Sequence, residues 1–167
     1  LAYHNLHVGA GFKGYLDNFR VYDGDTLVAR FEFVANDKES AGATVVELPA
    51  EIEYDKNPNY AVLIDNSKGT GFGQLYLNEV GMDHSKTYPV GDYTIKFDFY
   101  ALKIADSKNI VACMAAAGWS GNAFPGTDGQ VWIQIAERIN EWQTISFDVT
   151  TVKEGQFPNF HIGAGLK

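Results

Sequence analysis

The stretch DYTIKFDFYAL, Asp92–Leu102, alternates apolar and polar side chains with a period of two residues. One face of this segment would carry Tyr93, Ile95, Phe97 and Phe99, and the opposite face Thr94, Lys96, Asp98 and Tyr100. The segment TISFDV at 144–149 repeats the pattern. This periodicity predicts β-strands that bury one face in a core and leave the other face polar.

Short apolar runs bounded by Gly, Pro, Asn and Asp continue along the chain, and they predict further strands. We expect these at residues 27–34, 44–48, 60–65, 73–78, 110–115 and 130–135. About eight to ten short strands at this spacing indicate an all-β protein, an antiparallel β-sandwich of the jelly-roll type. Residues 135–142, IAERINEW, also contain apolar residues at helical spacing, but we interpret them as the end of a strand and a connector.

Two nearly identical nonapeptides, NLHVGAGFK at 5–13 and NFHIGAGLK at 159–167, lie near the two ends of the sequence. A phrase that recurs at this distance is typical of a tandem array of domain-sized units. We therefore expect residues 1–22 to be the closing strands of a repeat unit and 26–167 to be the main body of the sandwich. Because an unpaired edge of core residues favours aggregation, we expect residues 1–22 to complete the same sandwich.

The composition limits the possible partners. A formal net charge of −8 argues against nucleic acid, which requires a basic face, and against anionic membrane surfaces. No apolar run reaches 18 residues, so no membrane insertion is expected. Cys113 is the only cysteine, which excludes an internal disulfide and a cysteine metal site.

Several segments together resemble the jelly-roll carbohydrate-binding modules of the group that includes families 4, 16 and 22. The matching phrases, in chain order, are GYLDNFRVY at 14–22, RFEF at 30–33, YAVLID at 60–65, YPVGDYTIKFDFYA at 88–101 and EWQTISFDV at 141–149. The last strand of such a module would then precede the first. A rival resemblance joins HVGAGFKGYLDNFRVYDG, residues 7–24, to the closing strands of laminin-G or concanavalin-like jelly rolls.

The resemblance to carbohydrate-binding modules also implies a structural calcium ion, held between the closing strand and the opening strand. It assigns Asp17 as a calcium ligand and Glu32 as a weaker one. Alternation independently places Tyr15, Asp17, Phe19 and Val21 on one face, which would put a carboxylate in an apolar row. The alternative for Asp17 is an ion pair with Arg20 or Arg30, or an edge position in water.

Two predicted strands each place one aromatic side chain between two amides on the face away from the core. These triplets are Gln130, Trp132 and Gln134, and Gln74, Tyr76 and Asn78. Sugars are recognised by such sets, because an aromatic ring packs against the apolar face of a pyranose and amides bond its hydroxyls. Tyr100 would extend the same face. Trp119 lies in a predicted loop, where it would either contact the ligand or plug the end of the core. The alternative is that these are ordinary outward-facing strand residues.

The sequence contains no nucleophile motif, zinc-binding motif or phosphate loop, so no enzymatic activity is expected. We expect non-catalytic binding of a polysaccharide or oligosaccharide by one unit of an extracellular or cell-surface repeat protein, with neighbouring units as further partners. The alternative is a structural or adhesive repeat, a spacer or protein-binding stalk whose outward aromatic residues bind no ligand.

Overall fold

The computed structural model describes residues 13–40, 43–52, 59–65, 80–81, 86–103, 109–114, 130–134, 139–151, 155–156 and 160–164. For residues 40, 109–114, 130–134, 147, 149–151, 155–156 and 160–164 the description is of the backbone. Every regular element within these ranges is a β-strand, and every strand pair is antiparallel, so the prediction of an antiparallel all-β protein is confirmed.

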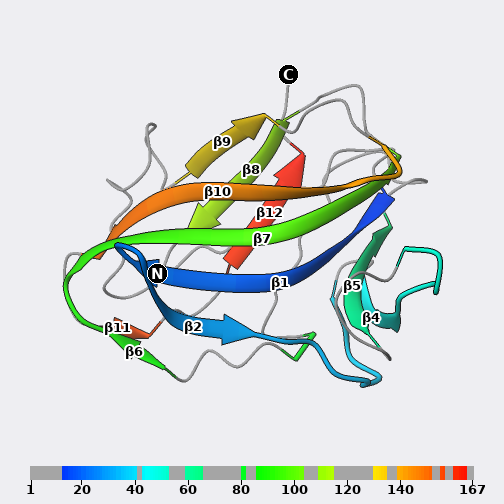
Figure 1. Cartoon of the computed structure of the whole chain (residues 1–167), viewed down its shortest axis with the longest axis horizontal. Coiled ribbons are helices and arrows are strands. Elements are labelled where there is room, and N and C mark those ends of the chain that lie inside the picture. The colour runs from blue at the N-terminus through cyan, green and yellow to red at the C-terminus, as the bar shows by residue number, and fades with distance from the viewer. Residues whose placement is uncertain are drawn as a thin grey trace.

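Seven strands form one large sheet with the order β10-β7-β1-β5-β4-β3, while β2 pairs with β1 off this path (Figure 1). The bounds are β1 Lys13–Asp23, β2 Thr26–Phe31, β3 Glu39–Ser40, β4 Ala43–Glu47, β5 Tyr60–Asp65, β7 Gly91–Lys103 and β10 Trp142–Thr151. One edge of β1 pairs with β7, and the other edge pairs first with β5 and then with β2. β1 therefore holds a central place in this sheet.

Two smaller sheets complete the described strands. β8 (Asn109–Met114) lies between β12 (Phe160–Ala164) and β9 (Gln130–Gln134), and β6 (Thr87–Tyr88) pairs with β11 (Gly155–Gln156). In Figure 1, β8 and β12 run across the direction of β7. The described part of the chain contains no helix long and apolar enough to cross a membrane.

One face of the β1–β7 pair forms the apolar core, and both strands supply its side chains. The fully buried members are Leu16, Phe19, Val21, Ile95, Phe97 and Phe99. The Phe19 ring stacks against Phe97 with centroids 6.4 Å apart. The centroid of the Phe31 ring on β2 lies 5.7 Å from that of Phe19. Burying one such side chain stabilises the fold by about 1.5–3 kcal/mol, so this face supplies much of the stability of the sheet.

Each predicted strand that falls on described residues is present, although some bounds differ. β5 occupies the predicted residues 60–65, and β4, β7, β8, β9 and β10 match their predicted segments to within a few residues. β2 ends at Phe31, three residues earlier than expected. The expected strand at 73–78 lies outside the described residues. Residues 139–141 are not helical and β10 begins at Trp142, which agrees with the connector interpretation as far as 135–142 is described.

Gly14 lies where the backbones of β1 and β7 approach closely. A Cβ atom at this position would lie 2.7 Å from the backbone oxygen of Tyr100 and 3.0 Å from Cζ of Phe99. The register also shifts between Lys13 and Gly14. No L side chain fits here without movement of the neighbouring backbone.

We predict that Gly14→Ala lowers the free energy of unfolding by about 1–3 kcal/mol through overpacking. Gly91→Ala is the matched control, because a Cβ there would meet its nearest atom, Cε2 of Tyr93, at 3.9 Å. The control is expected to be neutral or stabilising by about 0.4–1 kcal/mol, since alanine restricts the unfolded chain. Urea unfolding measures both variants, and equal effects at the two positions would contradict the close approach at Gly14.

Tyr93 is a buried tyrosine near the start of β7. Its hydroxyl donates a hydrogen bond to the carbonyl oxygen of Pro89 at 2.8 Å, and its ring meets Tyr88 edge-on. Burial, and to a lesser extent the negative charge of Asp23, raises the pKa of Tyr93 above its usual value of 10.0. The Tyr93 hydroxyl therefore ionises at a lower pH in the unfolded chain than in the folded protein.

The stabilisation contributed by neutral Tyr93 is expected to be complete below pH about 10 and to be lost as the pH rises further. Tyr93→Phe removes this dependence, but it also loses the bond to Pro89, worth about 1 kcal/mol. The stability difference between wild type and Tyr93→Phe should therefore narrow between pH 8 and pH 11 in urea unfolding. A difference that stays constant over this range would show that Tyr93 ionises equally in both states.

Candidate functional site

A bulge in β1 decides which side chains leave the core. Asp17 pairs with Asp98 and Arg20 pairs with Lys96, so Asn18 and Phe19 together oppose the single residue Phe97. Asn18 has a φ of 54°, in the left-handed region that Asn tolerates better than most residues. The extra residue inverts the alternation of the strand at this point.

The bulge corrects the predicted faces of β1. Tyr15, Asp17, Phe19 and Val21 were expected on one face, but only Phe19 and Val21 lie on the core face, together with Leu16. Asp17 lies on the opposite face, directly across from Asp98. The prediction of a carboxylate in an apolar row was wrong, because strict alternation ignores an inserted residue.

The face opposite the core, here called the polar face, is shared by β1, β7 and β10. The strand register places on it Asp17, Arg20, Tyr22, Thr94, Lys96, Asp98, Thr144, Ser146 and Asp148. Thr144, Ser146 and Asp148 on β10 are exposed, whereas Arg20, Tyr22 and Lys96 are half-buried. Among the described residues this face brings together polar and aromatic groups from three adjacent strands.

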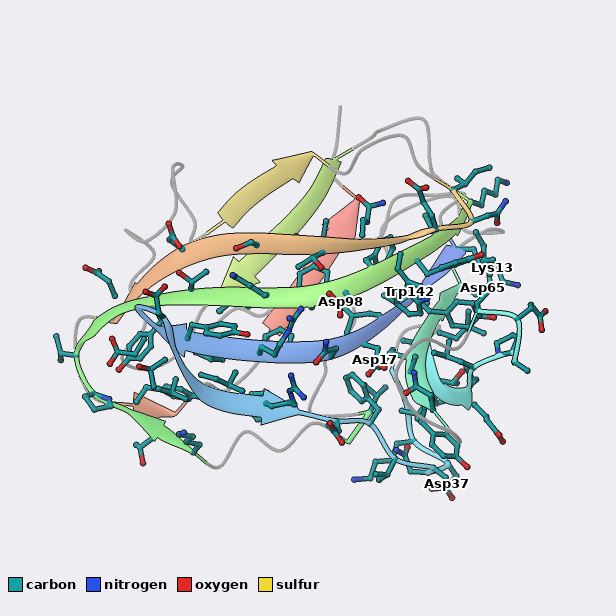
Figure 2. All side chains as sticks on the ribbon, in the orientation of Figure 1. Lys13, Asp17, Asp37, Asp65, Asp98 and Trp142 are labelled. Atoms are coloured by element: carbon teal, nitrogen blue, oxygen red, sulfur yellow. The ribbon has the colours of Figure 1, made fainter. Side chains whose placement is uncertain are left out.

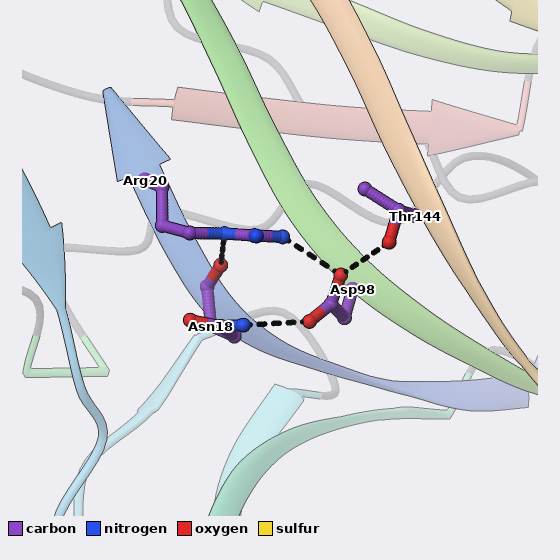
Figure 3. Close-up of polar contacts among 4 residues, drawn as sticks. All are labelled: Asn18, Arg20, Asp98 and Thr144. Atoms are coloured by element: carbon purple, nitrogen blue, oxygen red, sulfur yellow. Dashed lines mark hydrogen bonds and ion pairs between the residues drawn. The ribbon is translucent and has the colours of Figure 1, made fainter. Parts of the chain in front are cut away.

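Asp98 accepts hydrogen bonds from three neighbours on the polar face (Figure 3). Its Oδ1 accepts from Nη2 of Arg20 at 2.8 Å and from the Thr144 hydroxyl at 2.8 Å, and its Oδ2 accepts from Nδ2 of Asn18 at 2.7 Å. Arg20 Nε also donates to the backbone oxygen of Asn18 at 3.0 Å. Asp98 is only 7% exposed, so these charge-assisted bonds offset the cost of burying its carboxylate.

Tyr22 and Lys96 lie beside this cluster. Lys96 Nζ lies over the Tyr22 ring, 5.0 Å from its centroid. The next cross-strand pair, Thr94 and Asp148, is joined by a hydrogen bond from the Thr94 hydroxyl at 2.7 Å. The polar face therefore offers a half-buried ring next to hydroxyl, carboxylate and cationic groups held by their neighbours.

The other end of the same face is closed by apolar packing. Tyr15, Tyr100, Leu48 and Ala61 form a buried cluster, and Trp142 packs against it. Trp142 meets Tyr100 edge-on at 5.4 Å and donates from Nε1 to the backbone oxygen of Ile52 at 2.8 Å. Figure 2 shows Trp142 near Lys13 and Asp65, with Asp17 and Asp98 nearer the middle of the sheet.

Tyr100, one of the predicted ligand contacts, belongs to this closed end. It lies on the face with Lys96 and Asp98, as the alternation predicts, but it is only 8% exposed. The expectation that it is displayed to solvent was wrong, because residues 48–52 and Trp142 cover it. Periodicity assigns a face to a residue, but it does not show whether another segment covers that face.

The two predicted calcium ligands are in different surroundings. Asp17 is 2% exposed and faces Asp98, whereas Glu32 is exposed and follows the last residue of β2. The β1–β2 ladder runs from Phe19–Phe31 to Asp23–Thr26, so it does not place Glu32 opposite Asp17. Within the described ranges, no group of three or more His, Cys, Asp or Glu residues is arranged to hold a metal ion. Calcium binding stays a prediction from the resemblance.

The remaining predicted ligand contacts are not tested by the described residues. Gln74, Tyr76, Asn78 and Trp119 lie outside them. Gln130, Trp132 and Gln134 lie at alternate positions of β9, for which the backbone is described. The alternation of these three residues on one strand agrees with the prediction that they share a face, and their part in binding stays a prediction.

Sequence reasoning missed Asn18, Arg20, Tyr22 and Thr144 as members of one site. Arg20 and Tyr22 stand in the closing-strand phrase, but strict alternation does not place them on the same face as Asp17, as the bulge does. The residue that could have indicated the bulge from the sequence is Asn18, because Asn is depleted in strands and tolerates a left-handed backbone. Nothing local links Asp98 to Asn18, which is 80 residues away in the chain.

Comparisons with known proteins give no relative from which a function can be transferred. No family model matches this chain, and neither a curated protein nor a solved structure matches it. The function is therefore inferred from the chemistry of the polar face and from the sequence pattern.

We predict that Asn18→Ala destabilises the protein by about 1 kcal/mol more than Asn18→Gly. Both variants lose the bond to Asp98, but only glycine adopts the φ of 54° without steric cost. Ser146 on β10 supplies the control, because at an ordinary strand position glycine should be less stable than alanine. Urea unfolding gives the four values, and the same alanine-over-glycine order at both positions would contradict the bulge.

Proposed function

We propose that this chain is a non-catalytic carbohydrate-binding module with a β-sandwich fold of the jelly-roll type, and that the polar face takes part in binding. The module would form one unit of an extracellular or cell-surface repeat protein. The observation that carries the proposal is the arrangement of Tyr22, Lys96 and the Asp98 cluster on one partly open sheet face.

The sandwich part of the proposal is supported by the burial of both long strands. The core face of β1 and β7 is fully buried, which requires a covering layer. The sheet formed by β12, β8 and β9 supplies strands that run across β7 in Figure 1. A second sheet packed on the core face of β1 and β7 would make a β-sandwich.

The binding part is supported by the chemistry of the polar face. A sugar ring has an apolar face that packs on an aromatic ring, and hydroxyls that need donors and acceptors at fixed positions. Tyr22 would supply the ring, while Arg20, Asp98 and Thr144 would supply groups whose geometry is set by their mutual bonds. Such preorganisation lowers the entropy lost when a ligand binds.

The separation of Asp98 and Asp148 argues against their use as the carboxylate pair of a glycosidase. The acids Asp17, Asp98 and Asp148 lie on the polar face, and Asp17 lies directly opposite Asp98. Asp98 pairs with Thr144, and Asp148 lies four residues further on, about 13 Å along β10. The carboxyl groups of glycosidases lie roughly 5–10 Å apart. The Asp98 carboxylate moreover accepts hydrogen bonds from Arg20, Asn18 and Thr144.

The repeated nonapeptide supports a parent protein with several units. Each neutral hydrogen bond to a sugar contributes only about 0.5–1.5 kcal/mol, so one unit is expected to bind weakly. Linked units raise the effective concentration of each site and increase the overall affinity. A repeat arrangement would therefore suit a module of this kind.

We predict that affinity gels containing soluble polysaccharides retard the wild-type protein and that Tyr22→Ala reduces the retardation by about tenfold in apparent affinity. Losing a stacked ring that buries apolar area costs about 1–2 kcal/mol, which corresponds to roughly this factor. Trp132→Ala tests the face predicted on β9. Tyr60→Ala is the control, because Tyr60 is half-buried like Tyr22 but lies on β5.

Thermal unfolding of each variant confirms that it is folded. Retardation that survives in both Tyr22→Ala and Trp132→Ala would place binding elsewhere, and hydrolysis of any polysaccharide in the panel would contradict the non-catalytic proposal. No retardation by any polysaccharide would favour a structural or adhesive repeat.

A further inference from the structure

A row of three cationic side chains crosses the strands next to the Asp98 cluster. Arg20 on β1 pairs directly with Lys96 on β7 and with Arg30 on β2. Directly paired residues in a sheet point to the same face, and adjacent strands lie about 4.8 Å apart. Like charges in such positions destabilise a sheet, so their presence in a protein of net charge −8 needs an explanation.

The carboxylates on the polar face offset only part of this row. Arg20 forms an ion pair with Asp98 at 2.8 Å, and Asp17 lies opposite Asp98. Lys96 lies over Tyr22, and Asp148 is held by Thr94. Within the described part of the chain, neither Lys96 nor Arg30 has a carboxylate oxygen within ion-pair distance. Arg30 is also exposed, so its guanidinium is available to a ligand.

Arg30 also lines a surface pocket of about 310 Å³. The other lining residues are Ala29, Phe31, Glu32, Gly81 and Lys86. Lys86 donates to the backbone oxygen of Val28 on β2 and lies 5.6 Å from the centroid of the Tyr88 ring, which keeps a second cation beside the pocket. The pocket thus contains two cations and one acid, Glu32. The cationic row therefore continues through Arg30 into a hollow that can admit a ligand group.

We propose that this row and pocket bind the carboxylate groups of an acidic polysaccharide. The inference rests on the proposed function and specifies the class of glycan. An arginine binds a carboxylate through two parallel hydrogen bonds, and a lysine adds a compact charge beside it. Arg30 and Lys86 would take one carboxylate at the pocket, and Lys96 would attract another across the strands. A polymer with regularly spaced charges suits a row of cations better than an isolated anion does.

The test uses two polymers with the same backbone, polygalacturonate and its fully methyl-esterified, uncharged form. Affinity gels are run with wild type and with the double variant Arg30→Gln, Lys86→Gln. The double variant Lys13→Gln, Lys103→Gln is the control, because it removes the same charge at the opposite end of the β1–β7 pair. Among the described residues, that control breaks only the exposed Lys13–Asp65 ion pair. Thermal unfolding shows whether wild type and both double variants are folded.

Wild type is expected to bind polygalacturonate at least about tenfold more tightly than the ester, and only Arg30→Gln, Lys86→Gln should lose this preference. Added salt should weaken the polygalacturonate complex more than the ester complex. Equal binding of both polymers, or an undiminished preference in that variant, would overturn the inference. So would retention by dextran sulfate without retention by polygalacturonate.

A panel of neutral polysaccharides separates this inference from the proposed function. Binding of neutral polymers without any preference for polygalacturonate would leave the carbohydrate-binding proposal in place and refute the acidic class. Absence of binding to every polymer, neutral and acidic, would refute both.

Discussion

The inserted residue at Asn18 is the constraint from which the arrangement of the large sheet follows. On one side of the bulge Leu16 points into the core, and on the other side Phe19 and Val21 do. Without the insertion, Arg20 and Phe19 would exchange faces, which would bury a guanidinium in the core and expose a phenyl ring. The bulge thus lets one strand present two apolar stretches to the same core, with the polar cluster at the point of change.

The bulge and the Asp98 cluster depend on each other. The backbone turns at Asn18, and this turn brings both the Asn18 amide and the Arg20 guanidinium to Asp98. The same contacts compensate for a carboxylate that is nearly buried and lies opposite a second one, Asp17. Interactions of this kind cost desolvation energy, and so contribute more to fixing one register than to net stability. A shift of the β1–β7 register would separate Asp98 from its two donors on β1, Asn18 and Arg20.

The polar face has a closed end and a more open part, and the proposed binding contacts lie in the open part. Residues 48–52 and Trp142 cover Tyr100 and Tyr15, so that end contributes to packing. Beyond the Asp98 cluster, Tyr22, Lys96 and the exposed residues of β10 remain accessible. Because Arg20 belongs both to the Asp98 cluster and to the cationic row, the proposed sugar contacts and the proposed carboxylate contacts lie side by side on adjoining strands.

The sequence by itself determined the secondary structure to a large extent. Alternation in Asp92–Leu102 and Tyr60–Asp65 predicts strands that the structure contains, because side-chain periodicity is a local property of the chain. The membership of the site was decided by the tertiary structure. Asp98 meets Asn18, Arg20 and Thr144 only through strand pairing over 46 to 80 residues, and Tyr100 is covered by a distant turn. The bulge at Asn18 puts Asp17 on the face opposite Phe19 and Val21, because one inserted residue reverses the side chains before it relative to those after it. Strict period-two alternation does not allow for such an insertion.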